Sequence, residues 1–247
     1  MPDAPPLTIW GRDGVRETAG AHPLVVVEPD GAVRGTVLLV HGRNGAPDQP
    51  HIDEIARAYL SRGWRVAAPE LPFSGALPAS GPSDRVTLSG HAAAARAVWD
   101  KASGRWSDGA LALAGHSLGG FAVARIAGAA TSAHHVLGVS PVLSGRRMLA
   151  ARVAMGPPAV AALEREVPLM RAEMEREDAS DALAACDVPA AVVTGAADGL
   201  VRIGDARDWF RAARNGVFFG ALPGVHHCPT GEETALMLRA ALTALDA

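Results

Sequence analysis

The sequence contains very little cysteine. Cys186 and Cys228 are its only two cysteines, and they lie 42 residues apart with no C-x-x-C pair. A disulfide framework needs several cysteines, and a structural zinc site usually needs closely spaced pairs of ligands. The sequence therefore predicts neither a disulfide nor a metal site, and it favours a reducing compartment.

Runs of like charge and long apolar segments are also missing. No five consecutive residues carry the same charge, and the formal net charge of the 247 residues is −3. Such a balance predicts no surface for nucleic acid or an anionic membrane. No window approaches the roughly 18 apolar residues of a membrane span, and the N-terminal MPDAPPLTIWGRDG lacks the pattern of a signal peptide. We therefore expect a soluble cytoplasmic protein that acts on a small molecule; oligomeric state has no signature here.

Nucleotide-binding motifs are missing as well. No G-x-G-x-x-G follows the first predicted strand, and no glycine-rich loop carries a Walker-type lysine. Both motifs serve to hold the phosphates of nucleotides. We therefore expect no cofactor.

Seven short apolar segments alternate with segments of helical periodicity. The apolar segments cover residues 22–28, 36–42, 64–71, 110–117, 134–142, 189–198 and 217–224. They are continuous rather than alternating, which is typical of strands buried on both faces of a parallel sheet. The sequence therefore predicts an α/β fold with a mostly parallel central sheet and helices on both faces, as one domain over residues 1–247.

Two helices have clear boundaries. The first has one apolar stripe, and Gly63 follows it as a stop signal; its stripe consists of Ile52, Ile55, Ala56, Tyr59 and Leu60. The last helix is expected to begin with Thr230 and Glu233, which stand at capping-box spacing.

Residues 144–187 interrupt the alternation, because they contain no strand signal. We interpret them as a small helical cap, which Pro157 and Pro158 divide into two or three short helices. The cap contains four methionines that either line an acyl pocket or pack the cap onto the core, and the sequence leaves both possibilities open. They are Met148, Met155, Met170 and Met174.

A serine stands where a predicted strand turns into a predicted helix. Residues 111–120 read LALAGHSLGG, which places Ser117 in a G-x-S-x-G motif. A strand that turns abruptly into a helix strains its corner residue, and the flanking Gly115 and Gly119 relieve the crowding. The context of strand, turn and helix is the one this motif needs in order to present a reactive hydroxyl.

These residues resemble the α/β-hydrolase family, whose nucleophile elbow often reads G-H-S-x-G-G. The likeness extends from about residue 22 to the end of the chain. It implies the α/β-hydrolase fold with Ser117 as the nucleophile. It also implies an oxyanion hole made by the backbone N–H of Leu118 and by that of Arg43 in TVLLVHGRNG. We expect the Arg43 side chain itself to face solvent; the alternative is that its guanidinium group points toward an acidic group of the substrate.

The family's chain order of serine, acid and histidine implies the remaining catalytic residues. Asp198 follows the strand in PAAVVTGAAD, and His226 and His227 follow the next strand in VFFGALPGVHH. Related enzymes usually place the histidine three residues after a glycine, and Gly224 then favours His227 over His226. Asp198 has no competitor, because the segment after HHVLGVSPV contains no acidic residue at its strand end.

The other histidines are expected to be structural. His116, in the middle of the motif, is expected to face away from the pocket and to be packed or hydrogen-bonded. His134 and His135 have no acidic neighbour at ligand spacing, so we expect no metal there. Positions expected at the surface or a helix flank are His22, His51, His91, Asp205 and Asp208.

The resemblance implies a serine hydrolase of the carboxylesterase type that cleaves small or medium esters through an acyl-enzyme. A thioesterase or a C–C bond hydrolase with the same triad is an alternative, because fold and triad do not fix the substrate. A third possibility is a member of the fold that binds a ligand without turnover.

Overall fold

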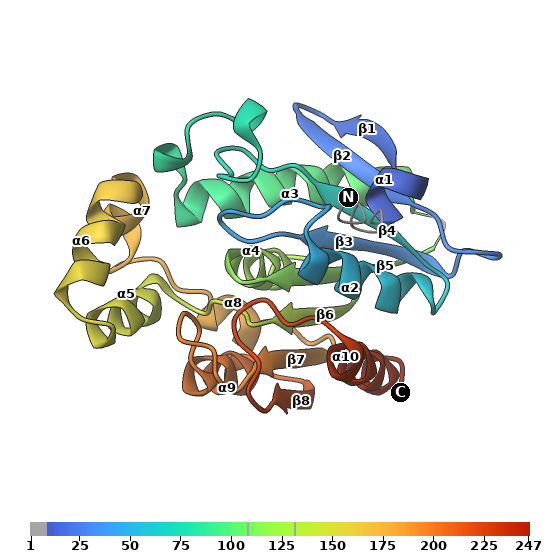
Figure 1. The fold of residues 1–247 in the computed structure, drawn as a ribbon. Helices are drawn as coiled ribbons and strands as arrows, with labels where there is room; N and C mark the ends of the chain where they lie inside the picture. Colours follow the sequence, from blue (N-terminus) through green and yellow to red (C-terminus); the bar gives the residue numbers. More distant parts are fainter. Residues whose placement is uncertain (1–8, 108, 131) are drawn as a thin grey trace, which may run out of the picture.

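In the part of the chain that the structure describes, eight strands form one sheet at the centre of the molecule (Figure 1). The structure is a computed structural model that describes residues 9–107, 109–130 and 132–247. The strands are β1 (Val15–Ala19), β2 (His22–Val27), β3 (Gly35–Val40), β4 (Trp64–Pro69), β5 (Ala110–His116), β6 (Ala133–Val139), β7 (Ala190–Gly195) and β8 (Gly216–Leu222). Their order in the sheet is β1-β2-β4-β3-β5-β6-β7-β8. The six strands β3, β4, β5, β6, β7 and β8 run parallel to one another. The predicted mostly parallel sheet is confirmed.

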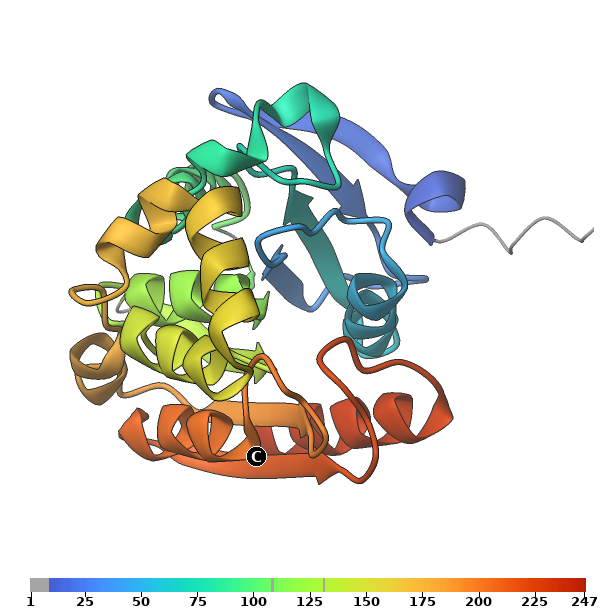
Figure 2. The same cartoon turned by 60° about the vertical axis from the view of Figure 1, so that its left-hand side comes forward.

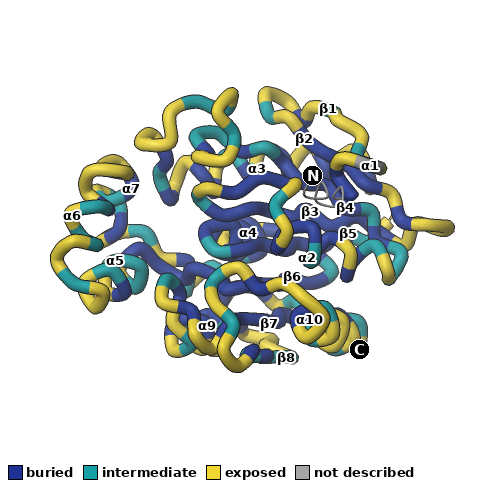
Figure 3. Tube along the Cα trace, in the orientation of Figure 1, coloured by how far each residue is buried: buried dark blue, intermediate teal, exposed yellow. Residues whose placement is uncertain are grey.

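Helices cover both faces of the sheet. One face carries α1 (Ile9–Asp13), α2 (Pro50–Leu60) and α10 (Glu232–Leu245), and the other carries α3 (Leu88–Arg105), α4 (Leu118–Ala127) and α9 (Ile203–Ala212). Alternate strand residues supply the two cores. Val37 and Leu39 pack on the first face, whereas Leu38 and Val40 pack on the second. The buried strands therefore lie between two layers of helices (Figure 3).

The segment between β6 and β7 leaves the sheet and returns to it. It contains α5 (Gly145–Ala154), α6 (Pro157–Glu166), α7 (Pro168–Glu173) and α8 (Ser180–Ala184). The first three stand off from the sheet, while α8 packs beside α4 (Figures 1 and 2). Pro157 and Pro168 each occupy the first turn of a helix, where the missing N–H costs nothing.

The two ends of the stretch that carries α5, α6 and α7 are bonded to each other, whereas α8 follows this junction. Ser144 and Asp178 form a β-bridge, and the N–H of Gly145 donates to the carbonyl of Glu177 at 2.9 Å. The N–H of Ala179 donates to the carbonyl of Leu143 at 3.0 Å. The chain therefore enters and leaves the cap at one point.

Two features differ from the sequence prediction. Strand β1 has no apolar run, because VRETA is an edge strand with mostly exposed side chains, so the pattern gave no signal for it. The capping box at α10 is wrong. Its N-cap is Gly231 at φ 94°, and that residue's N–H donates to the Glu54 carboxylate at 3.3 Å.

Within the described part of the chain, no helix has both the length and the apolar content needed to cross a membrane. Helix α3 has 18 residues but carries Arg96, Asp100 and Lys101.

The turn between β5 and α4 is a close approach of backbone to backbone. Ser117 has φ 55° and ψ −118°, outside the regions that L-residues favour. A Cβ on Gly119 would overlap the carbonyl oxygen of Val40, and a Cβ on Gly115 would overlap that of Gly119. Both glycines are therefore required for α4 to begin directly against β3.

Replacing Gly119 by alanine should destabilise the fold, because the overlap is with rigid backbone. We expect Gly119→Ala to lower the free energy of unfolding by about 1–3 kcal/mol or more, measured by urea unfolding. Gly104→Ala is the control, because its Cβ would enter open space in α3; it should match or slightly exceed the parent stability. Equal losses in the two variants would contradict the close approach.

Candidate active site

Ser117 lies at the corner between β5 and α4 and opens onto a cavity. The positive φ of this residue turns its side chain out of the sheet, where it lines the cavity wall. Its backbone is held on both sides, since its N–H donates to Val139 at 3.0 Å and its carbonyl accepts from Val142 at 3.0 Å. The hydroxyl therefore has a fixed position.

The structure brings Ser117, His227 and Asp198 together from three separate loops. The distance from Ser117 Oγ to His227 Nε2 is 2.9 Å, and that from His227 Nδ1 to Asp198 Oδ2 is 2.7 Å. A carboxylate beside Nδ1 fixes the proton on that nitrogen, which leaves Nε2 free to accept from the serine hydroxyl. The three side chains form one hydrogen-bonded relay.

Asp198 is held by more than the histidine. Its side chain is fully buried, and Oδ1 accepts the N–H groups of Leu200 at 2.8 Å and Val201 at 3.0 Å. Each carboxylate oxygen therefore has a partner, as a buried carboxylate requires.

Of the two adjacent histidines, only His227 reaches Ser117. The His226 ring is exposed, and its Nδ1 donates to the carbonyl of Ala197 at 3.0 Å. The geometry therefore favours His227 over His226 as the candidate base. The glycine spacing was the signal for it.

The two expected oxyanion donors line the same cavity. Leu118 is the first residue of α4, so its N–H has no acceptor inside the helix. The N–H of Arg43 has no acceptor among the residues that the structure describes. Both donors are therefore available beside Ser117.

The loop that carries Arg43 is braced by two buried histidines. The His41 ring donates from Nδ1 to the carbonyl of Gly42 at 2.7 Å and accepts the N–H of Leu71 at 3.1 Å. His91 donates from Nε2 to the His41 carbonyl at 3.0 Å. Burial lowers the pKa of His41 to about 4 and that of His91 to about 3, so both rings are neutral. The expectation that His91 lies at the surface is wrong.

His116 also differs from its expected position. It lines the cavity rather than facing away, and its Nε2 donates to the backbone carbonyl of His227 at 2.9 Å. His51 is buried against it, with ring centroids 4.4 Å apart, so its expected surface position is wrong too. Burial lowers the pKa of His51 to about 4 and that of His116 well below its usual value. His116 therefore holds the loop of the candidate base as a neutral ring.

The cavity beside Ser117 is small, with a volume of about 190 Å³. The sequence left open whether the cap methionines line the pocket or pack the cap onto the core, and both arrangements occur. Met148 lines the cavity, Met170 and Met174 are buried in the core, and Met155 is exposed. Helix α5 therefore contributes one apolar side to the site.

Asp205 was expected at the surface, but it is buried. It lies 3.2 Å from Arg147 of α5 and 2.9 Å from Arg202. Arg147 also contacts Asp208 of α9 at 2.7 Å. This ion-pair network ties the first cap helix to α9.

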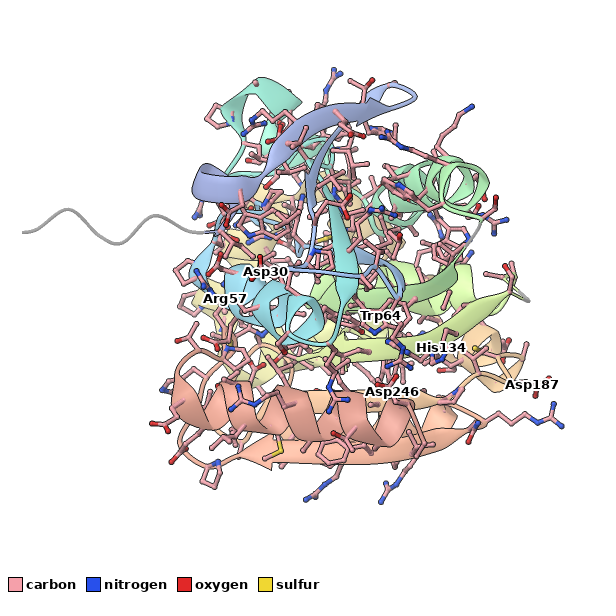
Figure 4. All side chains as sticks on the ribbon, turned by 90° about the vertical axis from the view of Figure 1, so that its right-hand side faces the viewer. Asp30, Arg57, Trp64, His134, Asp187 and Asp246 are labelled. Atoms are coloured by element: carbon pink, nitrogen blue, oxygen red, sulfur yellow. The ribbon has the colours of Figure 1, made fainter. Side chains whose placement is uncertain are left out.

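Two groups of side chains within the described ranges bring possible metal ligands within 4.8 Å of one another. One consists of His134, His135 and Asp246, none of which lines the cavity; Figure 4 labels His134 and Asp246. Its carboxylate already binds Arg34 at 2.7 and 2.9 Å and Arg62 at 3.1 Å.

The other possible ligand group consists of His51, His116 and Cys228, and it lines the cavity. The Nδ1 of His116 has no partner there. Burial and Asp198 raise the pKa of the Cys228 thiol, which disfavours the thiolate that binds metals. The mechanism proposed below uses neither group as ligands.

Comparison with solved structures shows that the chain has the α/β-hydrolase fold. Est1E from Butyrivibrio proteoclasticus, bound to ferulic acid, superposes with a TM-score of 0.74 at 17% identity, covering 94% of this chain and 100% of that one. An esterase domain from Rhodothermus marinus gives 0.66 at 20% identity, covering 95% and 98%. An alpha-beta serine hydrolase homologue from Coxiella burnetii gives 0.61 at 16%, covering 93% and 95%. No protein-family model and no curated protein matches the sequence.

The buried histidines predict that stability falls on acidification. Burial lowers the pKa of His41 and His51 to about 4, that of His91 and His135 to about 3, and that of His116 well below 6.5. Below pH 6.5 the unfolded chain binds protons at these rings while the folded chain does not, so the free energy of unfolding decreases toward pH 4. Above pH 6.5 these groups have no effect.

Urea unfolding between pH 8 and pH 4.5 measures this dependence. Each additional proton bound by the unfolded chain contributes a slope of about 1.4 kcal/mol per pH unit. Below pH 6 we expect the free energy of unfolding to fall with a slope that corresponds to the uptake of several protons by the unfolded chain. Equal free energies of unfolding at pH 7 and pH 5 would contradict the burial of these rings as neutral groups.

Proposed function

We propose that the protein is a serine hydrolase that cleaves carboxylic esters through an acyl-enzyme, with Ser117 as nucleophile, His227 as general base and Asp198 as its orienting acid. The observation that carries the proposal is the relay of 2.9 and 2.7 Å hydrogen bonds that ends on a strained serine. A serine hydroxyl attacks poorly by itself and needs such a base.

In the first half-reaction, the ester carbonyl lies beside Ser117 Oγ. His227 takes the hydroxyl proton at Nε2 as the Oγ–C bond forms, and Asp198 stabilises the resulting imidazolium through Nδ1. The N–H groups of Leu118 and Arg43 hold the negative oxygen of the tetrahedral intermediate. His227 then gives its proton to the leaving alcohol, and the acyl-enzyme remains.

In the second half-reaction, water enters where the alcohol left. His227 removes a proton from this water, the hydroxide oxygen attacks the acyl carbonyl, and the same two N–H groups hold the oxyanion. Collapse of the intermediate returns the proton from His227 to Ser117 and releases the acid. The cycle requires no cofactor.

The size of the cavity favours small substrates. A volume of about 190 Å³ lies below the usual range for pockets that enclose drug-sized ligands. The similar structures also support ester chemistry, since they include proteins described as esterases. We therefore favour small carboxylic esters over thioesters or C–C bonds, which the same triad can cleave in other proteins.

Loss of the nucleophile should abolish activity without affecting the fold. We expect Ser117→Ala to lose hydrolysis of p-nitrophenyl acetate completely, because no other side chain then attacks the carbonyl, and to keep the parent melting temperature. A fluorophosphonate probe should label the parent protein and not the variant. An unlabelled parent protein would favour a ligand-binding protein without turnover, and residual hydrolysis in the variant would move the nucleophile elsewhere.

The two neighbouring histidines should differ sharply in their effect on kcat. His227→Ala removes the base, so kcat should fall by about 10⁴-fold or more. His226→Ala, the matched control, removes only a bond to Ala197 and should change kcat by less than about tenfold. Steady-state kinetics with p-nitrophenyl acetate decides between them, and the opposite ranking would assign the base to His226.

A further inference from the structure

The cavity wall contains two arginines that come from different parts of the chain. Arg43 follows β3, and Arg152 lies in the last turn of the cap helix α5. The expectation that Arg43 faces solvent is wrong, because only 21% of its side chain is exposed and it lines the cavity. Two guanidinium groups, always charged in proteins, therefore border the space beside Ser117.

Neither arginine has a carboxylate within hydrogen-bond distance among residues 9–107, 109–130 and 132–247. The closest carboxylate to Arg43 is that of Glu166, 3.9 Å away and half exposed, which also lies 3.7 Å from Arg165. Arg152 contacts the sulfur of Met155 at 3.9 Å, and no carboxylate of the described residues lies within 4.0 Å of it. Other arginines of the cap are better paired, as Arg147 is with Asp205 and Asp208.

Nothing else in the cavity wall balances these charges. Among its lining residues there is no aspartate or glutamate in the part of the chain that the structure describes. Asp198 lies behind His227 with its side chain fully buried. His51 and His116 are neutral rings. The cavity is therefore positively charged.

The two arginines also repel each other. Burial, and next the charge of Arg152, lower the pKa of the Arg43 guanidinium. Holding two like charges together at a partly buried position costs free energy unless an anion lies between them. A carboxylate fits this position, because the planar guanidinium group binds it with two parallel hydrogen bonds.

We propose that Arg43 and Arg152 bind a carboxylate of the substrate, so that the protein prefers esters that carry a negative charge a few bonds from the scissile carbonyl. This inference rests on the proposed ester hydrolysis and names its substrate class. The negative charge must lie only a few bonds from the scissile carbonyl because one residue, Arg43, contacts both groups. Its backbone N–H is proposed to hold the oxyanion, and its side chain lines the same cavity. The small cavity leaves room for a short dicarboxylic half-ester.

A different role for Arg43 would be to hold the cap closed by pairing with Glu166. That pair has no hydrogen bond within 3.5 Å, and exposed pairs of this kind contribute little. It also gives no account of Arg152. Glu166→Gln separates the two roles, because loss of a closing contact would affect charged and neutral esters equally.

The test compares two esters that differ in one charge, p-nitrophenyl hydrogen glutarate and its neutral methyl ester. We expect the parent protein to have the higher kcat/KM for the charged ester. Arg152→Gln should lower the ratio of the two kcat/KM values about tenfold, mainly through KM, because a charge-assisted bond is lost. Added salt should lower the ratio in the parent protein.

Arg146→Gln is the matched control, because this arginine is on the same helix but outside the cavity wall, where it donates to the carbonyl of Glu175. It should leave the ratio unchanged. A parent protein that prefers the neutral ester, or a ratio that is equal in the parent and Arg152→Gln, would overturn the inference. If the parent protein gives either of these results but still hydrolyses the neutral ester through Ser117, the proposed ester hydrolysis stands and only the carboxylate site fails.

If neither ester is hydrolysed, the proposed function fails and binding decides the inference. Isothermal titration with glutarate should then show binding to the Ser117→Ala protein and at least about tenfold weaker binding when Arg152→Gln is added. Equal binding in the two proteins, or none in either, would overturn the carboxylate site.

Discussion

The close approach of α4 to β3 determines the geometry of the site. Gly119, in the first turn of α4, lies so near to Val40 that no side chain fits between them, and the chain must turn sharply at Ser117 to reach this position. The same approach puts the first N–H of α4 next to the loop after β3. One packing constraint therefore places the Ser117 hydroxyl beside the backbone N–H groups of Leu118 and Arg43, the two proposed oxyanion donors.

Neutral histidines stabilise the loops around this turn. His41 and His91 hold the loop after β3, while His116 bonds the backbone of the loop that carries His227. Burial keeps these rings uncharged, so each presents a fixed N–H donor instead of a cation. His227, the proposed base, therefore has no second positively charged ring beside it among these histidines.

The central strands of the sheet could be predicted, because a strand that is buried on both faces has a continuous apolar run. Strand β1 could not, since an exposed edge strand such as VRETA has no such pattern. The capping box failed because Gly231 adopts a positive φ directly before α10, and side-chain spacing carries no information about that backbone angle.

Within the site, the resemblance to the family predicted that Ser117, Asp198 and His227 would meet, because the fold brings the loops after three strands to one edge of the sheet, and the structure places these side chains within hydrogen-bond distance of one another. Polar residues whose burial depends on partners far away in sequence were misjudged. His51 is buried by His116, Asp205 by two arginines, and Arg43 by the cap above it. No local pattern records such pairings.

The cap begins and ends at a single pair of bonded residues, Ser144 and Asp178. Everything between them is a loop closed at its base. Its contacts with the rest of the molecule include the ion pairs of Arg147, the hydrogen bond from the Ser89 N–H to Glu173, and the burial of Met170 and Met174 in the core. Exchange of this segment for another of different length would leave the register of β6 and β7 intact. The cap helices and the loops that carry Ser117, Asp198 and His227 are thus separable stretches of the chain, and one can diverge in sequence while the other is retained.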